Sequence, residues 1–119
     1  MNIKFPLIEL LDRLVISKIK IDKGIDSSLE FNFYNNQAKE HNLSAVSNLL
    51  DELEIVHRNI WALEAELKSG KEQLLPLEEL GRRAIAIRDL NNQRIKIKNA
   101  MAEILHDPIR ELKKDHLSQ

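Results

Sequence analysis

Two Glu-x-x-His pairs, Glu54 with His57 and Glu103 with His106, offer the most specific chemistry in the sequence. A carboxylate and an imidazole three residues apart share one face of a helix, and two such pairs with two further Glu bind di-iron in four-helix bundles. In an antiparallel hairpin that turns near residue 73, the two pairs lie roughly 16 Å apart along the axis. One metal ion cannot contact both pairs within a chain, so we expect no metal site and no cofactor.

A second acidic pattern, Glu9-x-x-Asp12, imitates half of the signature of all-helical nucleotide pyrophosphatases. Those enzymes also need a Glu-Glu-x-x-Glu segment, and here Glu78-Glu79 is followed by Arg82 where the third acid should stand. A Gly-rich phosphate loop, a nucleophile elbow and a zinc-protease helix are all absent from the sequence. The motifs therefore favour a protein that is not an enzyme, although they leave catalysis open.

Polar side chains at helical spacing form two stripes beside the apolar positions. His57, Trp61 and Glu64 follow one another at intervals of four and three, and Asn91, Arg94 and Lys98 at intervals of three and four. With two residues of the first predicted helix they make a candidate ligand-binding set, which we call the polar cluster. It comprises Asp12, Lys20, His57, Trp61, Glu64, Asn91, Arg94 and Lys98.

Arg94 is the unusual member of this set, because it falls in a series of apolar positions. A buried arginine is costly unless a carboxylate faces it. The carboxylates available for this are Glu52, Asp12 and Glu64. One interpretation is a buried ion pair that fixes the register of the helices, with Trp61 simply packed. The other is a small anionic ligand held among Arg94, Lys98 and Trp61.

Composition excludes several classes of protein. The 119 residues suit one domain, and 18 Lys+Arg against 19 Asp+Glu argue against nucleic-acid binding by bulk electrostatics. The absence of Cys excludes disulfides and thiolate metal sites. Charged residues interrupt every apolar run before it reaches the ~18 residues of a membrane span. We therefore expect a cytoplasmic protein without nucleic-acid or membrane partners.

Apolar residues at helical spacing predict three main helices, over residues 6–23, 45–69 and 77–106. Pro6 suits a first helical turn and Gly24 a helix end. A short helix is expected over 29–40, with an irregular segment as the alternative. Ser27 with Glu30 forms a capping-box pattern, and Ser44 is the expected N-cap of the second long helix.

The two longest predicted helices repeat apolar residues every three or four positions, as coiled-coil packing surfaces do. In residues 45–69 the series is Val46, Leu49, Leu53, Val56, Ile60, Leu63 and Leu67. In residues 77–106 it is Leu80, Ala84, Ile87, Leu90, Ile97, Met101 and Ile104, with Arg94 in the same series. The short connection over 71–76 makes these helices antiparallel neighbours.

The predicted fold is an all-α bundle in which this hairpin packs with the N-terminal helix. It forms a single domain over residues 1–119, with 109–119 a weakly held tail. Because one hairpin and one further helix cannot enclose a wide core, we expect dimerisation to complete the bundle. Residues 51–67 carry five acids against one base (net −4), and residues 80–102 six bases against one acid (net +5). We expect these opposite charges to neutralise each other across the hairpin.

Several residues of the polar stripes also match the sequence pattern of a protein family. The sequence resembles an uncharacterised bacterial family of small all-helical proteins, a domain of unknown function, whose pattern opens Glu-Leu-x-Asp-Lys-Leu-Thr-Ile-Leu-x-Ile-Lys. Later blocks of that family read Asn-x-x-Leu-Trp-x-x-Glu-Asp and Asn-x-x-Arg-x-x-Ile-Lys. The matching residues here are Glu9, Leu10, Asp12, Leu14, Ile16, Ile19, Lys20, Trp61, Glu64, Asn91, Arg94, Ile97 and Lys98.

The chain departs from the family pattern at several positions. Arg13 replaces Lys, Val15 replaces Thr, His57 replaces Asn and Ala65 replaces Asp. The resemblance implies a helical fold and, through the genomic setting of some relatives, a link to envelope polysaccharide synthesis.

Two functions remain open at this stage. The first is a non-enzymatic protein that acts through protein–protein association, as a homodimer and with an unidentified partner, with its polar cluster organised around Arg94. The second is a protein that binds or converts a phosphorylated or sugar-nucleotide compound at that cluster.

Overall fold

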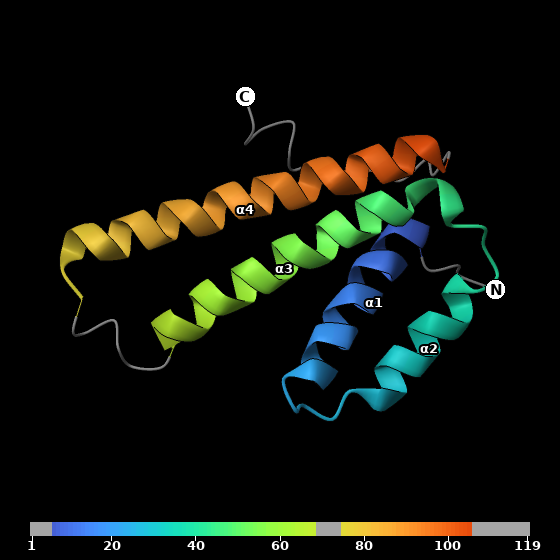
Figure 1. Ribbon diagram of the computed structural model, residues 1–119, viewed down its shortest axis with the longest axis horizontal. Coiled ribbons are helices and arrows are strands. Elements are labelled where there is room, and N and C mark those ends of the chain that lie inside the picture. Colours follow the sequence, from blue (N-terminus) through green and yellow to red (C-terminus); the bar gives the residue numbers. More distant parts are fainter. Residues whose placement is uncertain (1–5, 69–74, 106–119) are drawn as a thin grey trace.

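The computed structural model describes residues 6–68 and 75–105, and over these residues the chain is helical with no strand (Figure 1). The main helices are α1 (Leu7–Asp22), α2 (Ser28–Ala38), α3 (Ser47–Lys68) and α4 (Leu77–Ile104), and a 3-10 turn, η1 (Ser44–Val46), leads into α3. The prediction of an all-α bundle is confirmed. The expected connection over 71–76 lies mostly outside the described residues, as does the expected tail over 109–119.

The ends of α1 follow the residues that predicted them. Pro6 stands immediately before the helix with φ −56°, and its carbonyl oxygen accepts a hydrogen bond from the Leu10 amide. After the helix Gly24 adopts φ +83°, a left-handed conformation that costs glycine little because it has no Cβ. The chain then reverses into α2.

The short helix expected over 29–40 is confirmed as α2, but the predicted caps are wrong in detail. Ser27 occupies the N-cap of α2 without a side-chain capping hydrogen bond, so the capping box with Glu30 does not form. Ser44 opens η1 rather than α3, and its hydroxyl donates to the side-chain oxygen of Asn42 at 2.9 Å. Serine side chains readily find such local partners, and these compete with the helix cap.

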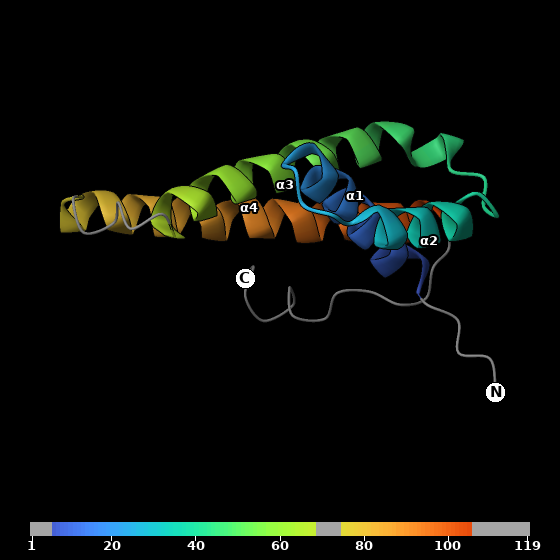
Figure 2. The same ribbon diagram turned by 90° about the horizontal axis from the view of Figure 1, so that it is seen from below.

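The helices form an antiparallel α3–α4 hairpin with α1 packed against one end of it and α2 packed on α1 (Figures 1 and 2). The core of this end of the hairpin, which we call the packed end, consists of buried apolar side chains from α1, α2, η1, α3 and α4. They include Leu11, Ile19, Ala38, Val46, Leu53 and Met101, each at most 4% exposed. Within residues 6–68 and 75–105, a third helix therefore covers only part of the hairpin.

Burial differs sharply along α4. Its fully buried residues are Ile95, Lys98, Met101 and Ala102, and no residue from 77 to 94 reaches that level. The predicted apolar series is correct at Met101 but wrong at Ile104, which is 44% exposed. The reason is that α4 turns toward α1 as well as α3, which brings the neighbouring face, with Lys98, into the core.

The expectation that α3 and α4 neutralise each other is correct only in part. Arg83 of α4 does form an ion pair with Glu66 of α3. Other partners lie within the same helix, as for Arg82 with Glu79, or come from α1, as where Glu54 accepts from Lys18 at 2.8 Å. Lys98 of α4 likewise meets Glu9 of α1 at 2.9 Å. The N-terminal helix thus neutralises charges of both hairpin arms.

Among the described residues, no helix is both long enough and apolar enough to cross a membrane.

Candidate ligand site

A buried Asp–His pair joins α1 to α3. His57 Nε2 lies 2.7 Å from Asp12 Oδ1, and the two side chains are 9% and 6% exposed. An ionised carboxylate can only accept, so Nε2 of His57 is the donor in this hydrogen bond. The pair fixes the orientation of the imidazole between the two helices.

The environment of Asp12 favours its charged form. Burial by itself would raise the pKa of this carboxyl, but the hydrogen bond from His57 and the positive charges of Lys98 and Arg94 outweigh burial and hold the pKa below its usual value. Asp12 is therefore a carboxylate at neutral pH. It supplies the negative charge that a buried lysine and a half-buried arginine require.

Lys98 connects α4 to the same carboxylate. Its side chain is 3% exposed, and its Nζ lies 2.9 Å from Glu9 Oε2 and 3.8 Å from Asp12 Oδ2. Glu9 and Asp12 are three residues apart, so they project from one face of α1. With Lys98 between them they cannot serve as the free acidic pair of a nucleotide pyrophosphatase.

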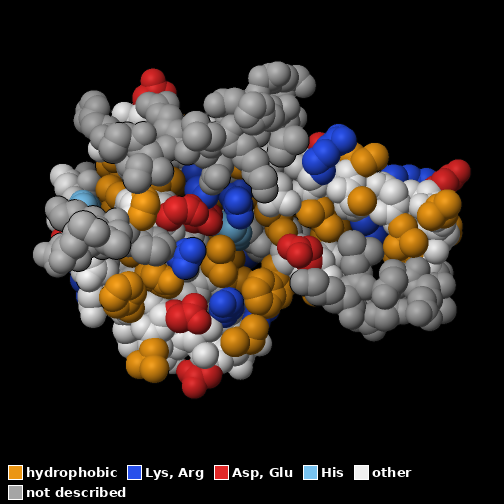
Figure 3. Space-filling view, turned by 180° about the vertical axis from the view of Figure 1, so that it is seen from behind, with side chains coloured by type: hydrophobic (Ala, Val, Ile, Leu, Met, Phe, Trp, Pro, Cys, Tyr) orange, Lys and Arg blue, Asp and Glu red, His pale blue; other side chains and the backbone are white. Residues whose placement is uncertain are grey.

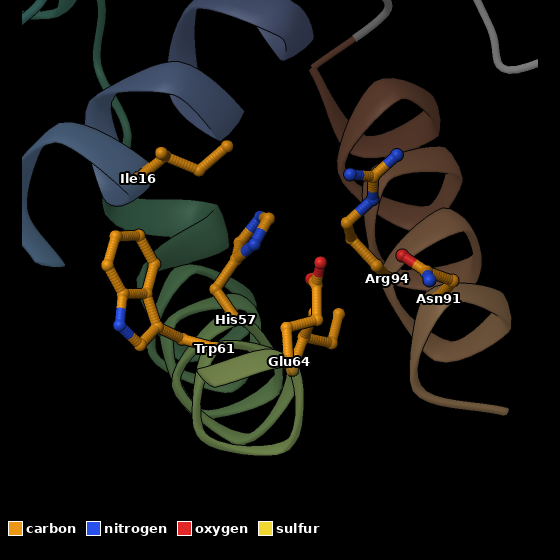
Figure 4. Close-up of a pocket in the computed structure, with 7 residues that line it drawn as sticks. Ile16, His57, Trp61, Glu64, Asn91 and Arg94 are labelled. Carbon is orange, nitrogen blue, oxygen red and sulfur yellow. The ribbon is translucent and has the colours of Figure 1, made fainter. Parts of the chain in front are cut away.

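A cavity of about 220 Å³ opens beside this network, between α1, α3 and α4 (Figure 4). Its lining consists of Ile16, His57, Ile60, Trp61, Glu64, Asn91 and Arg94. Figure 4 shows Trp61 and Ile16 on one side and Arg94 and Asn91 on the other. The Glu64 carboxylate points into the space between His57 and Arg94. Thus an apolar wall faces a polar one.

Arg94 has one donor that the described part of the chain does not satisfy. Its Nε is buried and has no hydrogen-bond partner there. A buried unsatisfied donor costs about 1–3 kcal/mol, more when it carries charge. Its positive charge does act on Asp12 and contributes to lowering the pKa of that carboxyl. Arg94 therefore combines a fixed positive charge with unused hydrogen-bonding capacity at the wall of a cavity.

The structure brings together seven of the eight residues of the polar cluster. Asp12, His57 and Lys98 form the buried network, and Trp61, Glu64, Asn91 and Arg94 line the cavity with His57. Lys20 does not belong, because its Nζ lies 3.6 Å from Glu30 Oε2 of α2. Figure 3 shows acidic and basic side chains next to each other on one face of this packed end.

Of the carboxylates expected to face Arg94, Asp12 interacts with its charge and Glu64 shares its cavity. The expectation that Glu52 could face Arg94 is wrong, because the Glu52 side chain is exposed on α3.

The Glu54–His57 pair does not act as a pair. Glu54 binds Lys18 and Arg58, whereas His57 turns to Asp12, so the two side chains diverge. Glu103 is exposed, and His106 lies outside the described residues. Within residues 6–68 and 75–105, no three His, Asp or Glu side chains gather closely enough to hold a metal ion.

Sequence reasoning missed three residues of the site. Glu9, the main partner of Lys98, shares a face with Asp12 at a spacing of three, and that spacing could have identified it. Ile16, four residues beyond Asp12, continues this face into the cavity. Ile60 was assigned to the apolar series of α3, which gave no indication that it also lines a cavity.

Comparisons of the chain with protein families, with curated proteins and with solved structures found no match.

Proposed function

We propose that this protein binds a small phosphorylated compound in the cavity between α1, α3 and α4. The observation that carries the proposal is the guanidinium side chain of Arg94, which lines the cavity between α1, α3 and α4. Arginine presents donors in a planar fork that matches phosphate oxygens, so this side chain suits a phosphate group bound in the cavity. This favours the ligand-binding alternative over a purely structural ion pair.

The remaining lining suggests the rest of the ligand. Glu64 and Asn91 offer acceptors and donors for hydroxyl groups, and Trp61 with Ile16 offers an apolar wall. The cavity of about 220 Å³ is smaller than the roughly 300–1,000 Å³ typical of sites for drug-sized ligands. A small phosphate monoester fits this size, whereas a nucleotide sugar would have to extend into solvent.

Thermal unfolding of the full chain tests the proposal with inorganic phosphate, glycerol phosphate, a hexose phosphate, the same hexose without phosphate and a nucleotide sugar. A phosphate monoester at a hundredfold excess over its Kd should stabilise the protein by about 2.7 kcal/mol. The unphosphorylated hexose should have no effect. A flat response to every phosphate compound would contradict the proposal.

Two arginines of α4 provide a matched pair of variants. Arg94→Met should abolish the stabilisation by phosphate compounds. Arg88→Met should retain it, because Arg88 is exposed and pairs with its neighbour Asp89. Equal loss in both variants would indicate attraction by net charge instead of a site.

Association with another protein chain is a second candidate function, and a different observation favours it. Leu77 and Ile85 of α4 are 84% and 51% exposed, although both are large and apolar. Exposed apolar side chains that lie together are typical of an interaction surface. This function does not need the cavity, so the two proposals can fail independently.

A further inference from the structure

Among the described residues, no third helix covers the end of the hairpin remote from α1 and α2. We call it the open end, and define it as residues 65–68 of α3 and 77–90 of α4. Figures 1 and 2 show it extending past the other helices, and no side chain from 77 to 90 is fully buried. A helix with an apolar stripe needs another element on which to bury that stripe.

Leu77, Gly81 and Ile85 form an exposed stripe on the outer side of α4, which we call the α4 outer stripe. They are four residues apart and so lie along one ridge of the helix. In Figure 3 hydrophobic side chains are interspersed with charged ones over this projecting end.

Gly81 is the second observation that points to a packing partner. A glycine inside a helix weakens it, and the packing of this chain offers no reason for one, because an added Cβ would meet nothing within 4 Å. Between two larger apolar residues, a glycine allows the backbone of a second helix to approach closely.

We propose that a second copy of this chain docks on the α4 outer stripe, with the two α4 helices antiparallel and the twofold axis beside Gly81. In that arrangement Leu77 packs on the partner's Ile85, and Ile85 on the partner's Leu77. The interface is isologous, so every contact occurs twice.

The charges beside the α4 outer stripe favour a second copy of this chain as the partner, and they favour an antiparallel orientation of the two α4 helices. Glu78 and Arg82 border the stripe on one side, with side chains 86% and 67% exposed. Antiparallel pairing brings Glu78 near the partner's Arg82, and Arg82 near the partner's Glu78. In a parallel pair about a twofold axis, Glu78 and Arg82 would face the opposite border of the partner's stripe, so this reciprocal pairing forms only in the antiparallel arrangement.

Analytical ultracentrifugation of the full chain over a range of concentrations tests the interface. The wild type should show a concentration-dependent dimer. Ile85→Glu should weaken dimerisation at least tenfold, because the new carboxylate would face the partner's Leu77 and Glu78. Ile55→Glu is the matched control, since Ile55 is 59% exposed on α3 outside the stripe, and its dimer should persist. A monomer at all concentrations, or a dimer insensitive to Ile85→Glu, would overturn the proposal.

Charge reversal tests the direction. Glu78→Arg should weaken the dimer at least tenfold, and Glu78→Arg combined with Arg82→Glu should restore it, because the reversed pattern is again self-complementary. Failure of the double variant to recover, with its helical circular dichroism intact, would count against antiparallel pairing.

Cross-linking provides a geometric test, because the chain contains no Cys. A mixture of Leu77→Cys protein and Ile85→Cys protein should form a disulfide dimer on mild oxidation, and neither variant should do so alone. Efficient cross-linking of Leu77→Cys with itself would show parallel helices and refute the arrangement.

Discussion

The packed end and the open end of the α3–α4 hairpin share one sequence pattern but differ in what surrounds them. At the packed end α1 covers the hairpin, and Leu53 and Met101 are completely buried. At the open end Leu80 and Ile87 hold equivalent positions in the apolar series and are only half-buried. The period of apolar residues therefore predicts which side of a helix packs, whereas the number of neighbouring elements determines how deeply.

The polar cluster lies where the two ends meet. Trp61 and Glu64 extend the polar stripe of α3 just past its buried residues, and Asn91 and Arg94 do the same on α4 before Ile95. A cavity forms here because α1 no longer fills the space between the two arms. The comparison thus explains the location of the candidate site as well as the exposure of the open end.

The two ends should differ most in the free energy of unfolding that is lost when an apolar side chain is shortened to alanine. Leu53→Ala should lower the free energy of unfolding by about 2–5 kcal/mol, because it leaves a cavity among fully buried neighbours. Ile87→Ala in the half-buried open end should cost about 1 kcal/mol. Urea denaturation at low protein concentration measures both. Equal losses would contradict the distinction between the ends.

The buried network should make the packed end sensitive to acid. The lowered pKa of Asp12 means that its contribution is fully present above its ordinary value of 3.8 and is lost as the pH falls through the folded-state value. Asp12→Asn should cost about 3 kcal/mol at pH 7, and the difference from wild type should shrink below about pH 4. Denaturation between pH 2.5 and 7 tests this expectation. The control is Glu30→Gln, an exposed ion-pair partner whose loss should cost about 0.5 kcal/mol or less.

The two cations of the cluster should behave differently on replacement by methionine. Lys98→Met removes a cation from the buried Asp12 and from the partly exposed Glu9, whereas Arg94→Met removes a donor that is already unsatisfied. We expect Lys98→Met to be less stable than Arg94→Met by about 2 kcal/mol. Thermal unfolding without ligand measures the difference. If Arg94→Met were the less stable variant, Arg94 would be a structural residue.

The smallest expected change in stability comes from replacing a small residue at each end by a larger one. Gly81→Ala should stabilise the dilute, monomeric protein by about 0.5–1 kcal/mol, because alanine favours the helix and its Cβ meets open space. Ala102→Val should destabilise it by about 1 kcal/mol or more, because Ala102 is 1% exposed in the core. Chemical denaturation of both variants provides the measurement. Loss of stability in Gly81→Ala under these conditions would show that the open end is packed within a single chain.

Local sequence determined the helices and their order. The apolar periods of α1 and α3, the proline before α1 and the glycine after it each act within a few residues, so their effects can be read from the chain alone. The short connection after α3 fixed the antiparallel hairpin. The stripes also identified most of the polar cluster, since residues three or four apart must share a helix face.

Only the tertiary structure decided which faces met. The position of α1 brought Lys98 and its neighbours into the core, joined Glu9 to the site and left Lys20 to α2, and none of these outcomes follows from spacing within a helix. Ion pairs and cavities depend on distances between elements far apart in sequence, and the rotation of each helix about its own axis sets those distances. Periodicity alone does not fix that rotation, and in the apolar series of α4 Met101 is completely buried whereas Ile104 is 44% exposed.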